Sequence, residues 1–217
     1  MTFESAELEV LAGKILSAPR ARQRRLIALA GAPASGKSTL AETLAVALTK
    51  AGCVTQVIPM DGFHLDNRIL AERGILGRKG APESFDAAGL VQLCKRLGDE
   101  DEVVFPVFDR SRDIAIAGCG LVTAQSDTII VEGNYLLFDT PAWRPLIQYW
   151  DIAIRLEVSR IELRQRLIRR WLEHGQTMEE AVARAQGNDL QNADIIERYR
   201  LDVPGQIVLR NSQSKED

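Results

Sequence analysis

The clearest chemical signal in the sequence lies in nine residues, 31–39. They read GAPASGKST, with two glycines five positions apart and a lysine and a hydroxyl residue directly after the second glycine. This spacing is typical of a loop whose backbone N–H groups surround a phosphate group. The apolar run 26–30 predicts a buried strand before the loop, and Leu40, Leu44 and Leu48 predict a helix after it. Strand, loop and helix in this order favour phosphate binding over a structural glycine-rich turn.

The side chains of this loop have separate expected tasks. Lys37 is a point charge that would reach the β- and γ-phosphates of a nucleoside triphosphate, and the Ser38 hydroxyl would hold Mg²⁺. The positive dipole end of the following helix adds to the attraction for phosphate. We therefore predict ATP and Mg²⁺ as cofactors, bound by Gly31, Ala34, Ser35, Gly36, Lys37, Ser38 and Thr39.

Acidic and basic residues follow two further apolar runs, where the strands of a parallel sheet would end. Asp61 comes after 54–60 and could accept a proton from an attacking hydroxyl or help to hold Mg²⁺; alternatively it caps a turn. His64 is a substrate contact or a hydrogen-bonded structural histidine. Glu132 ends the run 128–131 and would orient Mg²⁺ or its water ligand, unless it only turns the strand into a loop.

The region at about 159–175 is densely basic and predicts an arginine-rich lid helix. Arg166 and Arg170 are one helical turn apart on the same side, where they could stabilise the charge that builds up on a transferred phosphoryl group. The alternative is a solvated surface on which Glu157 and Glu162 pair with the arginines. A second basic cluster precedes the first strand and is expected to be solvated surface: Arg20, Arg22, Arg24 and Arg25.

The remaining pattern alternates strands with helices and predicts an α/β fold, a doubly wound and mainly parallel sheet of the P-loop NTPase type. Helices are expected at 3–18, 37–51 and 86–97, and after the capping residues Ser159 and Thr177. Strands are expected at 25–30, 54–60, 103–108, 128–131, 151–156 and 206–209. Pro59 indicates that the second strand has an irregular end or lies at an edge. We expect one domain over 1–217, with an N-terminal helix within 1–20 and a tail at 211–217.

Composition narrows the class of protein. The 217 residues carry a formal net charge of −3, so no basic footprint indicates a nucleic-acid partner. Apolar runs are too short to span a membrane, and the beginning of the chain does not resemble a signal peptide. Three scattered cysteines favour a reduced, cytoplasmic protein. The expected partner is a small-molecule acceptor, and a homodimer is left open.

The order of the motifs GAPASGKST, MDGFHL, GAPESFD, PVFDRSRD, IIVEGNYLL and LRQRLIRRWLEHG resembles the P-loop kinases that include uridine kinase, phosphoribulokinase and bacterial pantothenate kinase. The resemblance extends from Arg25 to about Leu209 and is closest to the fructose transport system kinase branch. It implies a catalytic role for Asp61, phosphate binding by Lys37, and Mg²⁺-linked positions at Ser38 and Glu132. It also implies lid roles for Arg166 and Arg170, and an aromatic–acid pair near the acceptor at Phe85 and Asp86.

The segment after Phe108 departs from the nucleoside kinases of this family. It reads Asp109-Arg110-Ser111-Arg112-Asp113 and lacks the histidine that reads a pyrimidine there. Carboxylates and arginines bind vicinal hydroxyls, so the polar residues favour a sugar such as fructose, although Asp109 and Arg110 could form only a local ion pair. The predicted acceptor contacts are Asp61, His64, Phe85, Asp86, Phe108, Arg110 and Asn134.

The sequence therefore predicts an ATP-dependent kinase that phosphorylates a hydroxyl of a small polar metabolite. A nucleoside or pantothenate kinase and a regulatory P-loop NTPase remain alternatives. The base-reading Asn-Lys-x-Asp of GTPases is absent from the sequence.

Overall fold

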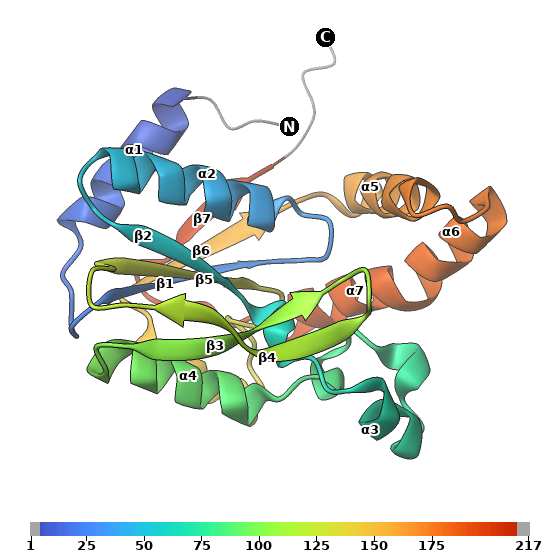
Figure 1. Ribbon diagram of the computed structural model, residues 1–217. Helices are drawn as coiled ribbons and strands as arrows, with labels where there is room; N and C mark the ends of the chain where they lie inside the picture. Colours follow the sequence, from blue (N-terminus) through green and yellow to red (C-terminus); the bar gives the residue numbers. More distant parts are fainter. Residues whose placement is uncertain (1–4, 212–217) are drawn as a thin grey trace, which may run out of the picture.

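The computed structural model describes residues 5–211, and its centre is a five-stranded sheet with the strand order β2-β5-β1-β6-β7 (Figure 1). Every pair of neighbouring strands is parallel. This confirms the predicted α/β fold, and it places the carboxyl ends of all five strands along one edge. The strands are β1 (Arg25–Gly31), β2 (Thr55–Pro59), β5 (Thr128–Gly133), β6 (Ile152–Glu157) and β7 (Ile207–Arg210).

Helices cover both faces of the sheet, because the central strands are apolar on both sides. In β1, Ile27 and Leu29 face a core shared with α1 (Ser5–Ser17) and α2 (Lys37–Lys50). Leu26 and Ala28 of the same strand face the opposite core, which includes buried residues of α4 (Ala87–Asp99). Figure 1 shows α1 and α2 above the sheet and α4 below it. Within residues 5–211, no helix is both long and apolar enough to cross a membrane.

The strand ends agree with the local sequence signals. β2 lies at one edge of the sheet and ends at Pro59, as the proline indicated. After β2 the chain enters a short 3₁₀ helix, η1 (Met60–Phe63). The segment up to residue 86 is mostly irregular, as expected, and holds α3 (Asn67–Glu72), η2 (Leu76–Arg78) and η3 (Pro82–Ser84).

The strand predicted at 103–108 is present, but it lies outside the parallel sheet. β3 (Val103–Asp109) pairs antiparallel with β4 (Ile114–Val122) in a separate two-stranded ribbon. β4 was not predicted, because it is mostly exposed and its apolar residues are interrupted by two glycines, without an alternation of apolar and polar residues. β4 forms because the chain reverses in a tight turn after β3 and pairs with that strand. The resulting ribbon places Phe108 and Arg110 at the carboxyl edge of the sheet.

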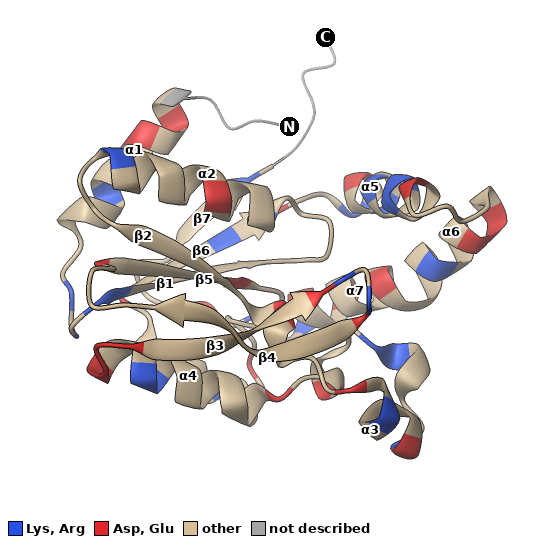
Figure 2. Cartoon of the chain, viewed as in Figure 1, with Lys and Arg blue, Asp and Glu red and all other residues tan. Residues whose placement is uncertain are grey.

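The predicted lid region, at about 159–175, projects beside this edge as α5 (Arg160–Glu173), and a further helix, α6 (Met178–Arg184), follows it (Figure 1). Figure 2 shows the basic residues of α5 in blue along the helix. Thr177 and Glu180 form the complete capping box before α6. Before α5, the Ser159 side chain accepts a hydrogen bond from the Glu162 N–H, while the Glu162 carboxylate contacts Arg166 four residues on. A π-helical turn, η5 (Ala185–Asp189), leads into α7 (Leu190–Arg198).

Two expectations about the chain near its ends need correction. Arg24 is not solvated surface, because it is 1% exposed and its guanidinium donates to the carbonyls of Leu97, Glu100, Asp101 and Thr123. Asn211 is not the start of a loose tail, because it is 6% exposed and hydrogen-bonded to Ser35. The rest of the predicted tail, 212–217, and residues 1–4 of the predicted N-terminal helix lie outside the described residues.

Candidate active site

The phosphate-binding loop connects β1 to α2 with an unusual backbone. Ala34 and Gly36 have φ angles of 61° and 91°, so both are left-handed. Gly31 is required for a different reason: a Cβ there would lie 2.7 Å from Ser35 Oγ and 3.1 Å from the Leu156 carbonyl. The N–H groups of the first turn of α2 have no acceptors within the helix. The loop therefore presents donors and a helix N-terminus to an anion.

A cavity of about 170 Å³ lies beside this loop at the carboxyl edge of the sheet. It collects eight of the residues that the sequence singled out: Lys37, Asp61, His64, Phe85, Phe108, Arg110, Asn134 and Arg170. The other lining residues are Pro33, Lys79, Gly80, Asp113, Trp171, Arg184, Asp189 and Asn192. Lysine and arginine side chains therefore face carboxylates and aromatic rings across one small space.

Ser38 and Glu132 do not line this cavity, but they contact each other beside Lys37 of the loop. The Ser38 hydroxyl donates to Glu132 Oε1 at 3.1 Å, and the other oxygen, Oε2, is buried without a hydrogen-bond partner. Burial raises the pKa of Glu132, against the lowering effect of the nearby Lys37. A buried carboxylate oxygen and a hydroxyl suit the oxygen preference of Mg²⁺. Among residues 5–211, no group of three His, Cys, Asp or Glu side chains is arranged to hold a metal ion.

Asp61 lies in η1, at the end of β2, and its carboxylate faces the cavity. Arg110 Nη2 donates to Asp61 Oδ2 at 2.7 Å. The local pair weighed between Asp109 and Arg110 is absent from the described contacts, because Asp109 accepts hydrogen bonds from Ser111 and the Arg112 N–H. The Ser111 hydroxyl lowers the pKa of Asp109 most. Arg110 is therefore available to the candidate base.

Three rings form one wall of the cavity. The His64 ring lies between Phe85 and Phe108, with centroid distances of 4.0 Å and 4.6 Å. Its Nδ1 is 2.8 Å from the Asp61 carbonyl, and burial lowers the pKa of His64. Asp86 lies outside this lining: its Oδ1 accepts from the Gly89 N–H at 2.9 Å and caps α4. The aromatic half of the predicted Phe–Asp pair faces the cavity, whereas the acid half begins a helix.

The two lid arginines lie in different surroundings. Arg170 lines the cavity, and burial lowers its pKa. Arg166 does not line it; its Nη1 donates to the Ser35 carbonyl at 3.0 Å and to the Ala34 carbonyl at 3.4 Å. One helical turn is enough to separate them, because the start of α5 crosses the loop and its end passes the cavity.

Sequence reasoning missed the contribution of α6 to the cavity. Arg184, at the end of α6, lies 5.2 Å from the centre of the Trp171 ring, and Arg170 lies 5.7 Å from it. The Trp171 indole donates to Asp189 at 2.7 Å. Arg184 and Asn192 are eight residues apart with a π-helical turn between them, so regular helical spacing does not indicate that they share this face.

Lys79 was also missed, because it lies in an irregular segment without periodicity. Its ammonium group donates to Asn67 at 2.7 Å, pairs with Asp113 at 2.9 Å and lies 5.1 Å from the centre of the Phe108 ring. Asp113 has a φ of 55° in the turn between β3 and β4. Only the folded ribbon brings this pair to the cavity.

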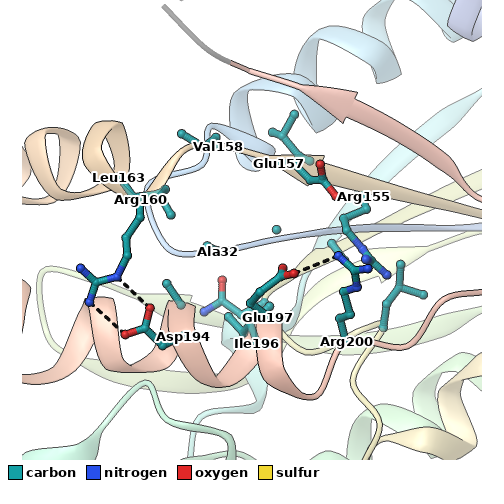
Figure 3. Close-up of a pocket in the computed structure, with 16 residues that line it drawn as sticks. Ala32, Arg155, Glu157, Val158, Arg160, Leu163, Asp194, Ile196, Glu197 and Arg200 are labelled. Carbon is teal, nitrogen blue, oxygen red and sulfur yellow. Dashed lines mark hydrogen bonds and ion pairs between the residues drawn. The ribbon is translucent and has the colours of Figure 1, made fainter.

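A second cavity, of about 330 Å³, lies on the other side of Ala32, between the start of α5 and α7 (Figure 3). Arg160 and Asp194 bridge it with two hydrogen bonds of 2.9 Å and 3.0 Å. Glu197 of α7 pairs with Arg200, which lies just beyond the end of this helix, as the dashed line in Figure 3 marks. Neither Lys37 nor Asp61 lines this cavity, so we place the candidate active site in the first one.

A parallel sheet with this strand order, a phosphate-binding loop after β1, acids after β2 and in β5, and an arginine-bearing lid define a P-loop kinase. The chain belongs to the Phosphoribulokinase / Uridine kinase family, whose model matches residues 26–194. The resemblance stated from the sequence is thereby confirmed.

Known relatives agree on this class of enzyme. A candidate uridine kinase of Schizosaccharomyces pombe is 36% identical over 205 residues, which cover 89% of this chain and 86% of that protein. A pantothenate kinase of Sorangium cellulosum is 32% identical over 162 residues, 72% of this chain and 53% of that protein. The crystal structure of a candidate fructose transport system kinase from Silicibacter sp. TM1040 matches with a TM-score of 0.89 and 52% identity, covering 96% of this chain and 99% of that one. The names describe kinases with different acceptors.

Proposed function

We propose that this protein transfers the γ-phosphoryl group of ATP to a hydroxyl group of a small neutral polyol, a sugar such as fructose. The acceptor would occupy the cavity beside Asp61 and the aromatic wall. The protein from Silicibacter sp. TM1040 that is named for a fructose transport system shares 52% identity, which supports this choice of acceptor. We expect the protein to act in the cytoplasm, because its scattered cysteines favour a reducing compartment.

The observation that carries the proposal is the matched charge on the acceptor side of the cavity. Arg110 pairs with Asp61 at 2.7 Å and Lys79 pairs with Asp113 at 2.9 Å. Each pair offers donors beside acceptors, which suits vicinal hydroxyl groups, since every hydroxyl both donates and accepts. The rings of His64, Phe85 and Phe108 offer an apolar surface to the C–H face of a sugar.

Asp61 is proposed as the base that accepts the proton of the attacking hydroxyl. The Arg110 contact would orient its carboxylate toward the cavity. Lys37 and Arg170 would stabilise the negative charge on the transferred phosphoryl group and on the leaving phosphate. Ser38 and Glu132 would hold Mg²⁺, which would neutralise part of the charge on the phosphate groups.

The test is a screen of acceptors with ATP and Mg²⁺, in which phosphorylated products are detected by mass. The panel contains fructose and other neutral sugars, uridine, pantothenate and D-glycerate. We expect a neutral sugar to be phosphorylated with stoichiometric release of ADP. A uridine or pantothenate product would overturn the proposed acceptor and keep the kinase. Hydrolysis of ATP without any phosphorylated acceptor, stimulated by a protein partner, would favour the regulatory NTPase.

The same assay tests the proposed base. Asp61→Asn keeps the shape of the side chain and removes its basicity, so turnover should fall by about 10²–10⁴-fold while ATP still binds. The matched control is Asp66→Asn, because Asp66 is an exposed N-cap of α3 and asparagine caps helices equally well. Near-normal turnover of Asp61→Asn would show that this aspartate is structural.

A further inference from the structure

Three segments that are distant in sequence meet behind the phosphate-binding loop. Asn211, directly after β7, donates from Nδ2 to the Ser35 carbonyl at 2.7 Å. Arg166, from α5, donates from Nη1 to the same carbonyl at 3.0 Å and from Nη2 to the Asn211 carbonyl at 3.2 Å. The Asn211 N–H in turn donates to the Glu157 carbonyl of β6 at 2.8 Å. The loop is therefore tied to the sheet and to the lid helix at one point.

These contacts fall on the part of the loop that is conformationally costly. Ala34 has a φ of 61°, a left-handed conformation that is unfavourable for a residue other than glycine. Gly36, with a φ of 91°, flanks the anchored carbonyl on the other side. Such conformations persist when the surrounding structure holds them. Asn211 and Arg166 supply that support from outside the loop.

The direction of a carbonyl also determines the direction of the next N–H group. No peptide bond in the described chain is cis, so the Ser35 carbonyl and the Gly36 N–H lie in one plane and point in opposite directions. Holding the Ser35 carbonyl outward, toward Asn211 and Arg166, turns the Gly36 N–H toward the inside of the loop. A Cβ on Gly36 would lie 2.8 Å from Asn211 Nδ2, which shows how closely Asn211 packs against the loop.

We propose that Asn211 and Arg166 are positioning residues that hold the phosphate-binding loop in its anion-binding conformation from behind. Arg166 then acts through the loop backbone and not on the transferred phosphoryl group, in contrast to the lid role expected from the sequence. The inference rests on the proposed binding of nucleotide phosphates by this loop, and it is independent of the acceptor.

The affinities for three ligands distinguish this positioning role from a direct contact between these residues and the nucleotide. They are Mg²⁺ complexes of ATP, ADP and inorganic pyrophosphate, titrated against wild-type protein, Asn211→Ala and Arg166→Ala. A deformed loop lowers the affinity for all three ligands to a similar extent, because each of them places phosphates in the loop. We expect affinity losses of about 3- to 10-fold for Asn211→Ala and about 10- to 100-fold for Arg166→Ala, in line with neutral and charged hydrogen bonds. Turnover of Asn211→Ala at saturating ATP should stay within about 3-fold of wild type.

Two exposed neighbours serve as controls. The control substitutions are Arg210→Ala and Arg164→Ala. Arg210 lies directly before Asn211, with 84% of its side chain exposed, and Arg164 lies on the exposed side of α5. Neither should change the affinity for any of the three ligands. If Arg166→Ala does not fold, Arg166→Lys replaces it, since lysine keeps the charge and loses the planar fork that reaches the carbonyls of Ala34, Ser35 and Asn211.

Other patterns would overturn the proposal. Weaker ATP binding with unchanged ADP and pyrophosphate would place Arg166 on the γ-phosphate. Weaker ATP and ADP binding with unchanged pyrophosphate would indicate contact with the nucleoside. Unchanged affinity for all three would make these contacts irrelevant to the loop. A wild-type protein that binds none of the ligands would instead refute the proposed function.

Discussion

Gly62→Ala should separate catalysis from nucleotide binding, because Gly62 lies next to Asp61 where η1 crosses β3. A Cβ at this position would be 2.2 Å from the Pro106 carbonyl oxygen and 2.7 Å from its carbon. Both atoms belong to the backbone of β3, so no side chain can turn away. Gly62 does not have a positive φ angle, so the close approach alone makes this position unsuitable for alanine.

The magnitude follows from the overlap. Raising the shortest contact from 2.2 Å to 3.0 Å requires a shift of 3.0 − 2.2 = 0.8 Å. Asp61 moves with η1, and Arg110 moves with the ribbon, so the candidate base loses its position relative to the acceptor. A misplacement of about 1 Å costs about 10²-fold in turnover, and overpacking costs about 1–3 kcal/mol of stability.

The assay compares turnover, ATP affinity and urea denaturation for Gly62→Ala and Gly77→Ala. Gly77 also lies in a short 3₁₀ helix, and a Cβ there meets nothing within 4 Å, so this control should leave all three quantities near wild type. We expect Gly62→Ala to bind ATP normally, because the phosphate-binding loop is a separate segment. Turnover within a few-fold of wild type would refute the importance of this placement, and equal loss of ATP binding would refute the separation of the two sites.

Three further predictions concern the nucleotide, the buried arginine and pH. Lys37→Ala should abolish the thermal stabilisation by ATP and Mg²⁺ without changing the melting temperature of the free protein, because Lys37 is a partly exposed cation; stabilisation equal to wild type would contradict its phosphate role. Arg24→Ala should lower the free energy of unfolding in urea by about 3–5 kcal/mol, since it leaves four carbonyls without their donor. Arg20→Ala, which removes an exposed ion pair whose atoms are 3.9 Å apart, should lower the free energy of unfolding by less than about 1 kcal/mol. Equal effects of Arg24→Ala and Arg20→Ala would be inconsistent with the structure. Burial lowers the pKa of His64 below its usual 6.5, so the unfolded chain binds more protons and stability falls as pH drops through that value. His64→Phe should flatten the fall of melting temperature between about pH 7.5 and 5.5, and an unchanged slope would exclude this histidine as its source.

Sequence reasoning succeeded where the determining residues are neighbours in the chain. The loop at 31–39, the strand before it and the helix after it follow from short-range patterns, because a phosphate-binding loop is one contiguous segment. Asp61 and Glu132 could be placed at one edge of the sheet for a similar reason. Each follows or ends an apolar run, and parallel strands bring their carboxyl ends together. The parallel sheet itself followed from the alternation of apolar and helical patterns.

The contacts of the basic residues depended on the tertiary structure. Arg166 and Arg170 carry the same charge on the same side of one helix, yet Arg166 reaches loop carbonyls and Arg170 reaches the cavity. The periodicity of a sequence predicts on which side of a helix a residue lies, but it does not predict which other segment that side contacts. Arg24 shows the same limit, because its carbonyl partners come from the end of α4 and the loops around β3 and β4.

The sequence by itself determined that a phosphate-binding loop with an acid at the next strand end would form, because local spacing encodes both. Only the tertiary structure decided which side chains complete the site. Lys79, Asp113 and Arg184 reach the cavity through an irregular segment, an antiparallel ribbon and a helix beyond the lid. Asn211 reaches the loop from 176 residues away in sequence. Such contacts depend on how whole elements pack, and no local pattern of residue types records that packing.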